Sequence, residues 1–260
     1  MHGLILMTTE LLTHTQGETL VMTLSGPGNR NALSPQVYAA GIEALNMAEF
    51  SPDIRAVVLT GAGGHFCAGG DLQRLRHNRA HDLNAQREAV QSFHDWVLAL
   101  RAFPKPVVAA VEGHAAGGGV SLALACDAIC ASEEARFGLS YIRAGLSPDG
   151  GLSMQLGQAL GRQRAWAALS LGETHEARDW AQWGLVHSLH EPGQALTGAL
   201  TLCETLARQA PEALASIKEL MNQSDTHLHT QMKSELQHFM HNLVQVAAGD
   251  AIESFFQRPR

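Results

Sequence analysis

Short apolar runs alternate with helical segments in the first half of the chain. Runs of β-branched and small apolar residues predict buried strands at Thr19–Leu24, Arg55–Thr60, Pro106–Glu112 and Ala128–Ala131. A helix is predicted from Ser34, because serine is a favoured N-cap residue and Pro35 suits the first helical position. A second helix is expected over Val120–Cys126. Strands that alternate with helices in this way indicate an α/β core.

Helical periodicity dominates from about Asp149 onward. We expect helices at Leu152–Leu160, Arg164–Leu171, Glu176–Trp183, Ala195–Arg208 and Pro211–Met221. Thr226–Ala248 forms a further helical segment that is partly amphipathic. Since no Pro- or Ser-rich linker is visible, we divide the chain into a core at residues 1–195 and a helical C-terminal region at residues 196–260.

The composition narrows the class of protein and of partner. A hydrophobic content of 45% over 260 residues supports a sizeable folded core. Only 17% of the residues are charged and the formal net charge is −7, so we expect neither a nucleic acid nor a membrane as partner. The expected partners are small molecules and further copies of the same chain.

The cysteines bear on the cellular compartment of the protein, and the histidines bear on whether it binds a metal ion. The 4 cysteines lack the spacing and density of a disulfide scaffold, which predicts a reducing, cytoplasmic location. The apolar run Leu4–Met7 is too short for a signal peptide. His238 and His241 have helical ligand spacing but no third ligand nearby, so we predict no metal site.

Two glycine-rich loops, His65–Leu72 and Glu112–Val120, each follow a predicted strand. Glycine permits close backbone approach and unusual φ angles, so both loops can aim N–H groups at an anion. The helix predicted after the second loop would strengthen that effect through its N-terminus.

Other known glycine-containing motifs match this sequence less well. Gly61–Gly64 lacks the third glycine and the immediate helix of a dinucleotide fold, and no glycine run leads into the lysine of a P-loop. Gly119–Ala123 matches a nucleophile elbow only in part, because its closing glycine is missing. A serine hydrolase that uses Ser121 stays an alternative of another class.

The ordered set of motifs resembles the crotonase (enoyl-CoA hydratase/isomerase) superfamily across nearly the whole chain. The motifs are Arg30-Asn-Ala-Leu33, Phe66-Cys-Ala-Gly-Gly-Asp-Leu72, Pro104-Lys-Pro106, Gly113-His-Ala-Ala-Gly-Gly-Gly-Val-Ser-Leu-Ala-Leu-Ala-Cys-Asp127, Phe137-Gly138, Gly145-Leu-Ser-Pro-Asp-Gly-Gly151 and Phe255-Phe256-Gln-Arg258. The resemblance implies an α/β spiral of ββα units with a helical C-terminal trimerisation region. It also implies a homotrimer or a dimer of trimers.

The resemblance further implies an acyl-CoA thioester as substrate, with coenzyme A as part of the substrate and no separate cofactor. In that family two peptide N–H groups hold the thioester oxygen, and by motif position they belong to Gly70 and Gly118. Such donors favour an enolate over the ground-state carbonyl. By the same resemblance, the path of coenzyme A is lined by Arg30, Ala32, Ala68 and Leu72, with Phe255 or Arg258 approaching from a terminal helix.

The two positions at which related hydratases carry glutamates read Ser121 and Tyr141 here. Neither side chain is a general base near neutral pH without a large perturbation. Asp149 stands where other members, including isomerases of phenylacetate degradation, carry an aspartate. We therefore predict double-bond or ring isomerisation with Asp149 as the base, while a role for Asp149 as cap of the following helix stays open.

Hydration by an unconventional site is the alternative within the family, with Tyr141 bonded to the substrate and Ser121 holding a water. The whole chain also resembles a subgroup often labelled as an alternative oxepin-CoA hydrolase, a label that does not establish a reaction. A non-catalytic acyl-CoA-binding protein is the alternative outside the enzymes, because glycine loops alone are compatible with it.

Overall fold

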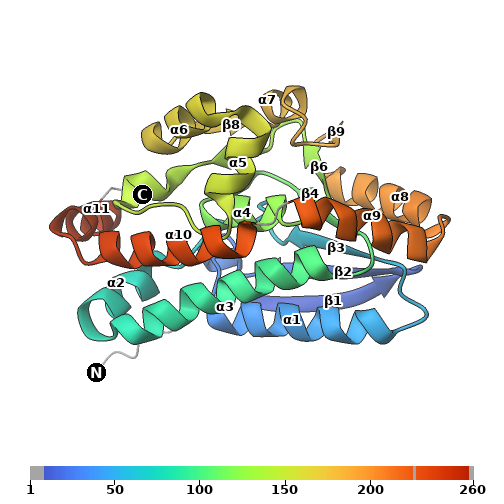
Figure 1. Cartoon of the computed structure of the whole chain (residues 1–260), viewed down its shortest axis with the longest axis horizontal. Helices are drawn as coiled ribbons and strands as arrows, with labels where there is room; N and C mark the ends of the chain where they lie inside the picture. The colour runs from blue at the N-terminus through green and yellow to red at the C-terminus, as the bar shows by residue number, and fades with distance from the viewer. Residues whose placement is uncertain (1–8, 225–226, 258–260) are drawn as a thin grey trace.

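The computed structural model describes residues 9–224 and 227–257, and its largest element is a mostly parallel sheet (Figure 1). Within the described residues the strand order is β1-β2-β3-β4-β6-β9. The strands are β1 (Glu10–Gln16), β2 (Thr19–Ser25), β3 (Ala56–Gly61), β4 (Val107–Val111), β6 (Ala128–Ser132) and β9 (Ser188–His190). Only β1 pairs antiparallel to its neighbour; the other strands of this sheet run parallel.

A second, small sheet stands beside the first and has the order β5-β7-β8. Its strands are β5 (His114–Ala116), β7 (Arg136–Gly138) and β8 (Thr174–Glu176). The chain passes from β4 in the large sheet to β5 in the small one and then into α4 (Gly118–Leu124), and it repeats the step from β6 to β7. The predicted α/β spiral of ββα units is therefore confirmed.

Both faces of the large sheet are buried, as the apolar runs of its strands predict. On one face, Ala56 and Val58 of β3 pack with residues of α8 (Ala195–Ala207). Their neighbours Val57 and Leu59 point to the opposite face and join the main core. We refer to these two sides as the α8 face and the site face of the sheet.

Most of the remaining helices cover the site face or build a wall beyond it. The remaining helices are α1 (Pro35–Phe50), α2 (Leu72–His81), α3 (Leu83–Ala102), α5 (Leu152–Leu160), α6 (Arg162–Leu171), α7 (Ala177–Gln182), α9 (Pro211–Ser224), α10 (Leu228–Leu243) and α11 (Val246–Gln257), with 3-10 turns η1 (Pro27–Asn29) and η2 (Ser140–Ala144). Of these, α9 contacts α3 and buries none of its residues. The N-cap predicted at Ser34 is confirmed, since its side chain accepts a hydrogen bond from the Val37 N–H. No described helix is long and apolar enough to cross a membrane.

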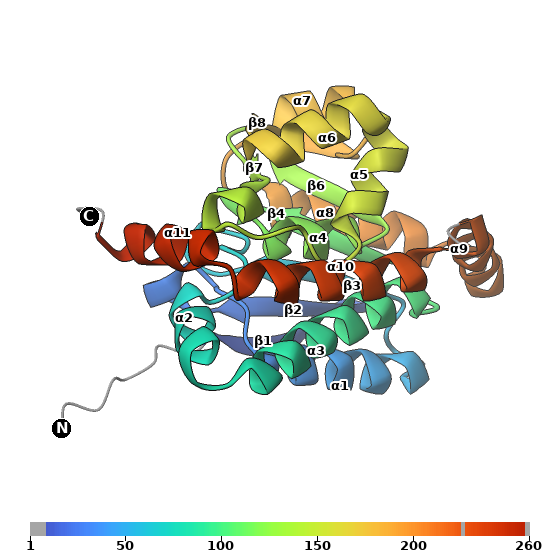
Figure 2. The same cartoon turned by 60° about the vertical axis from the view of Figure 1, so that its left-hand side comes forward.

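The last two helices close over the first part of the chain. α10 crosses α3, and α11 lies beside α2 (Figure 2). Arg79 of α2 fixes this arrangement, because its guanidinium donates to the Leu243 carbonyl at 2.8 Å and to the Gln245 carbonyl at 3.1 Å. The division of the chain near residue 195 and the trimerisation role of these helices stay predictions.

Candidate active site

The two glycine-rich loops are joined by backbone hydrogen bonds. The Cys67 N–H donates to the His114 carbonyl at 3.0 Å, and the Ala116 N–H donates to the Cys67 carbonyl at 2.9 Å. Gly69, at a φ of 88°, permits the close approach: a Cβ there would lie 2.5 Å from the Ala116 oxygen. A side chain at position 69 would therefore force the loops apart.

This contact brings Gly70 and Gly118 to the rim of one cavity. Gly118 is the first residue of α4, so its N–H has no partner within the helix. A Cβ on Gly69 would lie 3.2 Å from the Gly118 nitrogen, which shows how near the two loops are. Among the described residues, no group accepts a hydrogen bond from the N–H of Gly70 or Gly118. Both donors are thus available to an anion.

The cavity has a volume of about 340 Å³ and receives most of the predicted site residues. Those that line it are Arg30, Ala68, Gly70, Leu72, Gly118, Tyr141, Asp149 and Phe255. Ala32 and Ser121 are buried behind the lining, at 7% and 0% exposure. Arg258 lies outside the described residues. The motif positions therefore converge on one hollow, although they are spread over more than two hundred residues.

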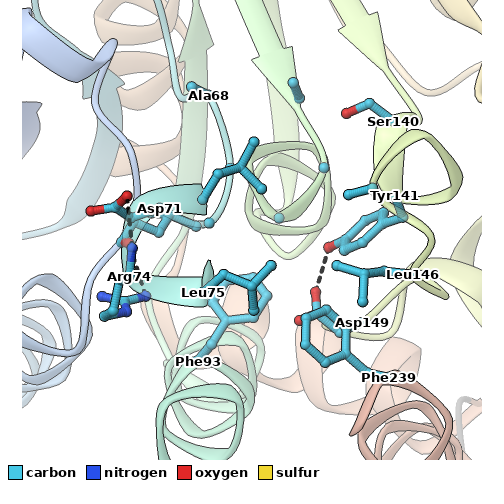
Figure 3. Close-up of a pocket in the computed structure, with 18 of the residues that line it drawn as sticks. Ala68, Asp71, Arg74, Leu75, Phe93, Ser140, Tyr141, Leu146, Asp149 and Phe239 are labelled. Carbon is cyan, nitrogen blue, oxygen red and sulfur yellow. Dashed lines mark hydrogen bonds between the residues drawn. The ribbon is translucent and has the colours of Figure 1, made fainter. Parts of the chain in front are cut away.

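Asp149 is the centre of a short polar chain on one side of the cavity (Figure 3). The Tyr141 hydroxyl donates to Asp149 Oδ1, and the Ser121 hydroxyl lies 3.2 Å from the Tyr141 hydroxyl. Ser121 Oγ also donates to the Asp149 backbone carbonyl at 2.9 Å. Tyr141 and Ser121 therefore orient Asp149 from η2 and from α4.

Burial dominates the electrostatics of this group. Desolvation raises the pKa of Asp149 to about 7; the Tyr141 hydrogen bond opposes the rise, and the negative charge of Glu235 adds to it. Burial and the neighbouring Asp149 raise the pKa of Tyr141 well above its usual value. At neutral pH the phenol is a neutral donor and the carboxyl is poised to gain or lose a proton.

The open alternative, in which Asp149 caps the following helix, is wrong. α5 begins at Leu152 with Gly151 as its N-cap, and no side chain of the N-cap contributes a hydrogen bond. Glu235 of α10 instead accepts from the N–H groups of Gly151 and Ser153, and the Leu152 N–H donates to the backbone carbonyl of Asp149 at 3.4 Å. The carboxylate of Asp149 is thereby free to face the cavity.

Comparison with known proteins decides the family. The profile of the enoyl-CoA hydratase/isomerase family matches residues 14–258. The chain belongs to this family. It is thus an enzyme of the crotonase type, and the family acts on acyl-CoA thioesters.

Individual relatives of this enzyme carry different activities in their names. An Escherichia coli 2,3-dehydroadipyl-CoA hydratase is 36% identical over 216 residues, covering 83% of this chain and 82% of the relative. An E. coli 1,2-epoxyphenylacetyl-CoA isomerase is 33% identical over 227 residues, covering 86% and 87%. A crystal structure of an enoyl-CoA hydratase from Polaromonas sp. JS666 is 47% identical, with a TM-score of 0.82 over 95% of this chain and 96% of that one.

The sequence interpretation missed the far wall of this enzyme's cavity, which comes from α2, α3 and α10. Leu75, Phe93 and Phe239 lie opposite or beside Asp149, and Arg74 stands at the other end (Figure 3). A signal for α3 was present, because Phe93, Trp96, Val97 and Leu100 have helical spacing and are all buried.

Proposed function

We propose that this enzyme isomerises an unsaturated acyl-CoA thioester, moving a double bond or rearranging a ring, with Asp149 as the base. One observation carries the proposal: Asp149 is a cavity-lining carboxyl only 7% exposed, and its pKa is raised to about 7. The other aspartate of the lining, Asp71, is occupied, because it accepts hydrogen bonds from the N–H groups of Gln73 and Arg74.

In the proposed reaction the thioester oxygen lies between the N–H groups of Gly70 and Gly118. Asp149 takes a proton from a carbon of the acyl group, and the electron pair of that C–H bond moves toward the thioester oxygen to give an enolate. The carboxyl then returns the proton to a different carbon. Two donors aimed at the oxyanion stabilise the intermediate, and removal of one such donor is worth about 3–4 kcal/mol in other enzymes.

The surroundings of Asp149 support a single base better than a pair of groups that activates water. Ser121 is fully buried, and its hydroxyl already donates to the Asp149 carbonyl. Tyr141 is a neutral phenol that donates to Asp149. Hydration is retained as the competing reaction, because one relative is named a 2,3-dehydroadipyl-CoA hydratase and another a 1,2-epoxyphenylacetyl-CoA isomerase.

The same proposal places coenzyme A along the mouth of the cavity. Arg30 supplies a positive charge at this mouth, Ala68 and Leu72 flank Gly70, and Phe255 approaches from α11. No cofactor beyond the coenzyme A of the substrate takes part. We further propose a cytoplasmic homotrimer or dimer of trimers, which light scattering of the purified protein distinguishes by mass.

Product mass separates the reactions. Purified protein is incubated with crotonyl-CoA, a 3-enoyl-CoA and a ring-containing enoyl-CoA, and products are followed by chromatography and mass spectrometry. We expect a product of unchanged mass that disappears in Asp149→Asn and persists in the matched control Asp53→Asn, which changes an exposed aspartate. Gain of one water by the substrate would overturn the proposal in favour of hydration, and thioester binding without turnover would favour a non-catalytic protein.

A further inference from the structure

The turn that follows Asp149 is held by side chains from distant helices. Gly150 and Gly151 have φ angles of 66° and 79°, so the chain turns sharply through two left-handed residues. A Cβ on Gly150 would lie 2.7 Å from the Phe93 ring, and one on Gly151 would lie 2.7 Å from Leu228 Cδ1. The turn is therefore packed tightly but has no capping side chain of its own.

Two buried side chains supply the missing hydrogen-bond acceptors. The Gly150 N–H donates to His94 Nε2 at 3.1 Å, and the Gly151 N–H donates to Glu235 Oε2 at 2.7 Å. The Ser153 N–H and hydroxyl both donate to Glu235 Oε1, at 3.0 and 2.5 Å. His94 and Glu235 are 2% and 4% exposed. Each donor of the turn thus meets an acceptor shielded from water.

The chemistry of these contacts fixes the state of both acceptors. An imidazole nitrogen that accepts a hydrogen bond carries no proton, so His94 is neutral; burial accordingly lowers the pKa of His94 to about 4. Burial raises the pKa of Glu235, and the three hydrogen bonds that it accepts at the N-terminus of α5 oppose this rise and favour the ionised carboxylate. Neither side chain lines the cavity, so neither is placed to touch the substrate.

We propose that His94 and Glu235 are positioning residues that hold the turn directly after Asp149. Through Glu235, α10 takes part in positioning the carboxyl group of Asp149. This inference rests on the proposed role of Asp149 as base. α10 crosses α3 and contacts α5 (Figure 2). His94 therefore reaches the turn from α3, and Glu235 reaches it from α10. Displacement of a reacting group by about 1 Å can cost 100-fold in rate, which is why a distant clamp matters.

Glu235 also acts through its charge. The groups around Asp149 are Tyr141 from η2, Ser121 from α4, Tyr38 from α1 and Glu235 from α10, and His94 of α3 is bonded to the next residue, Gly150. Burial raises the pKa of both tyrosines, so they titrate far above neutral pH, whereas His94 titrates far below it. The negative charge of Glu235 is therefore the element of this set that can tune the proton affinity of Asp149 near neutral pH.

The test compares Glu235→Gln with Glu235→Asp and with the control Glu219→Gln, which changes an exposed glutamate of α9. Glutamine keeps one oxygen acceptor but turns an amide group toward the second N–H. We expect kcat of Glu235→Gln to fall about 10- to 100-fold with KM changed less than about threefold, and the acid limb of kcat/KM to move to lower pH. Glu235→Asp, which keeps the charge, should retain the pH profile of the wild type.

A second pair of variants covers the case in which Glu235→Gln does not fold. His94→Gln retains a neutral acceptor for the Gly150 N–H, whereas His94→Leu does not. We expect His94→Gln to keep kcat within about threefold and His94→Leu to lose about tenfold or more. Equal activity of these two variants would contradict the positioning role of His94.

A measurement without turnover separates this inference from the proposed function. Carboxyl carbons of aspartate are labelled with ¹³C, the Asp149 signal is assigned by its loss in Asp149→Asn, and its titration is recorded in the wild type and in Glu235→Gln. We expect the titration of Asp149 to move to lower pH in Glu235→Gln. Identical titration curves together with unchanged kcat would overturn the inference, whereas full activity of Asp149→Asn would overturn the proposed function and leave the titration result standing.

Discussion

The two faces of the large sheet are built from the same strands but have opposite contents. On the α8 face, valines and alanines of β3 and β4 pack against Ala195, Ala199 and Cys203, and this cluster contains no charged group. On the site face, the same strands lie beneath Ser121, Asp149, His94 and Glu235, which are all buried. The α8 face can be understood from hydrophobic burial alone, whereas the site face retains groups that burial disfavours.

The difference shows where the molecule gives up stability for chemistry. Each of the four buried polar groups of the site face has a hydrogen-bond partner, which limits the cost of removing it from water. The pKa values of Asp149 and Glu235, both raised by burial, reflect the part of that cost that remains. We expect substitutions on the two faces to separate activity from stability.

Asp149→Asn should have the largest effect and should move activity and stability in opposite directions. If Asp149 is the base, as proposed, its loss should lower kcat/KM by about 10²- to 10⁴-fold, measured with the substrate that the wild type turns over. Because burial raises the pKa of Asp149 from 3.8 to about 7, ionisation destabilises the fold progressively between these pH values, by roughly 4 kcal/mol at most above pH 7. The neutral asparagine removes this cost, so the free energy of unfolding should rise more at pH 8 than at pH 5.

Urea unfolding at pH 5 and at pH 8 tests the predicted change in the free energy of unfolding. The control Asp53→Asn, on the surface, should unfold like the wild type at both. A variant Asp149→Asn that is less stable than the wild type at pH 8 would show that the carboxylate is stabilised rather than strained by its surroundings.

Val58→Ala tests the α8 face, where we expect a substitution to lower stability and to leave activity nearly unchanged. Val58 is fully buried among residues of α8, so its truncation leaves a cavity and should lower the free energy of unfolding by about 2 kcal/mol. The kcat/KM of the folded enzyme should stay within about twofold of the wild type. A matched truncation at Leu12, which is 51% exposed, should leave both quantities nearly unchanged. Loss of activity in Val58→Ala without loss of stability would break the separation of the two faces.

Tyr141→Phe should have a smaller effect on the site face and a specific signature. The phenol donates to Asp149 and lowers the pKa of that carboxyl, so its removal should move the acid limb of kcat/KM to higher pH. We expect kcat at neutral pH to fall about tenfold, as one hydrogen bond to a charged group is lost. An acid limb that moves to lower pH would contradict the assignment of this limb to Asp149.

Ser121→Ala should have the smallest effect. Ser121 donates to the backbone carbonyl of Asp149 rather than to its carboxylate, so about 1 kcal/mol, or fivefold in kcat, is at stake. Hydrolysis of a simple ester, if present, should be the same in this variant as in the wild type. Ester hydrolysis that disappears in Ser121→Ala would instead indicate a serine hydrolase.

The sequence was informative where local pattern decides the structure. The predicted strand at Arg55–Thr60 corresponds to β3, and the helix predicted at Leu152–Leu160 has the same bounds as α5. The segment Thr226–Ala248 was predicted to be mostly helical, and its described part holds α10 and the start of α11, with a break after Leu243. Asp149, which the resemblance singled out, lines the cavity, while its role as base stays a prediction.

Other parts of the site depend on tertiary contacts that no local pattern encodes. Residues 72–102 were assigned no element, although they form α2 and α3 and supply a wall of the cavity. The contact between Gly151 and Glu235 joins positions 84 residues apart, and glutamate on an amphipathic helix is ordinarily read as a surface residue. Only the packing of α10 over the core shows that this carboxylate is buried.

The backbone ladder between the two glycine loops has a consequence for how such enzymes diversify. The N–H groups of Gly70 and Gly118 are located by main-chain bonds such as that from Ala116 to Cys67, which do not involve the side chains at positions 121, 141 and 149. In the proposed mechanism, replacement of residues 121, 141 or 149 would therefore redirect the path of a proton without rebuilding the place where negative charge accumulates. Under this proposal, related enzymes would keep the two glycine loops and change the residues that transfer protons by single substitutions.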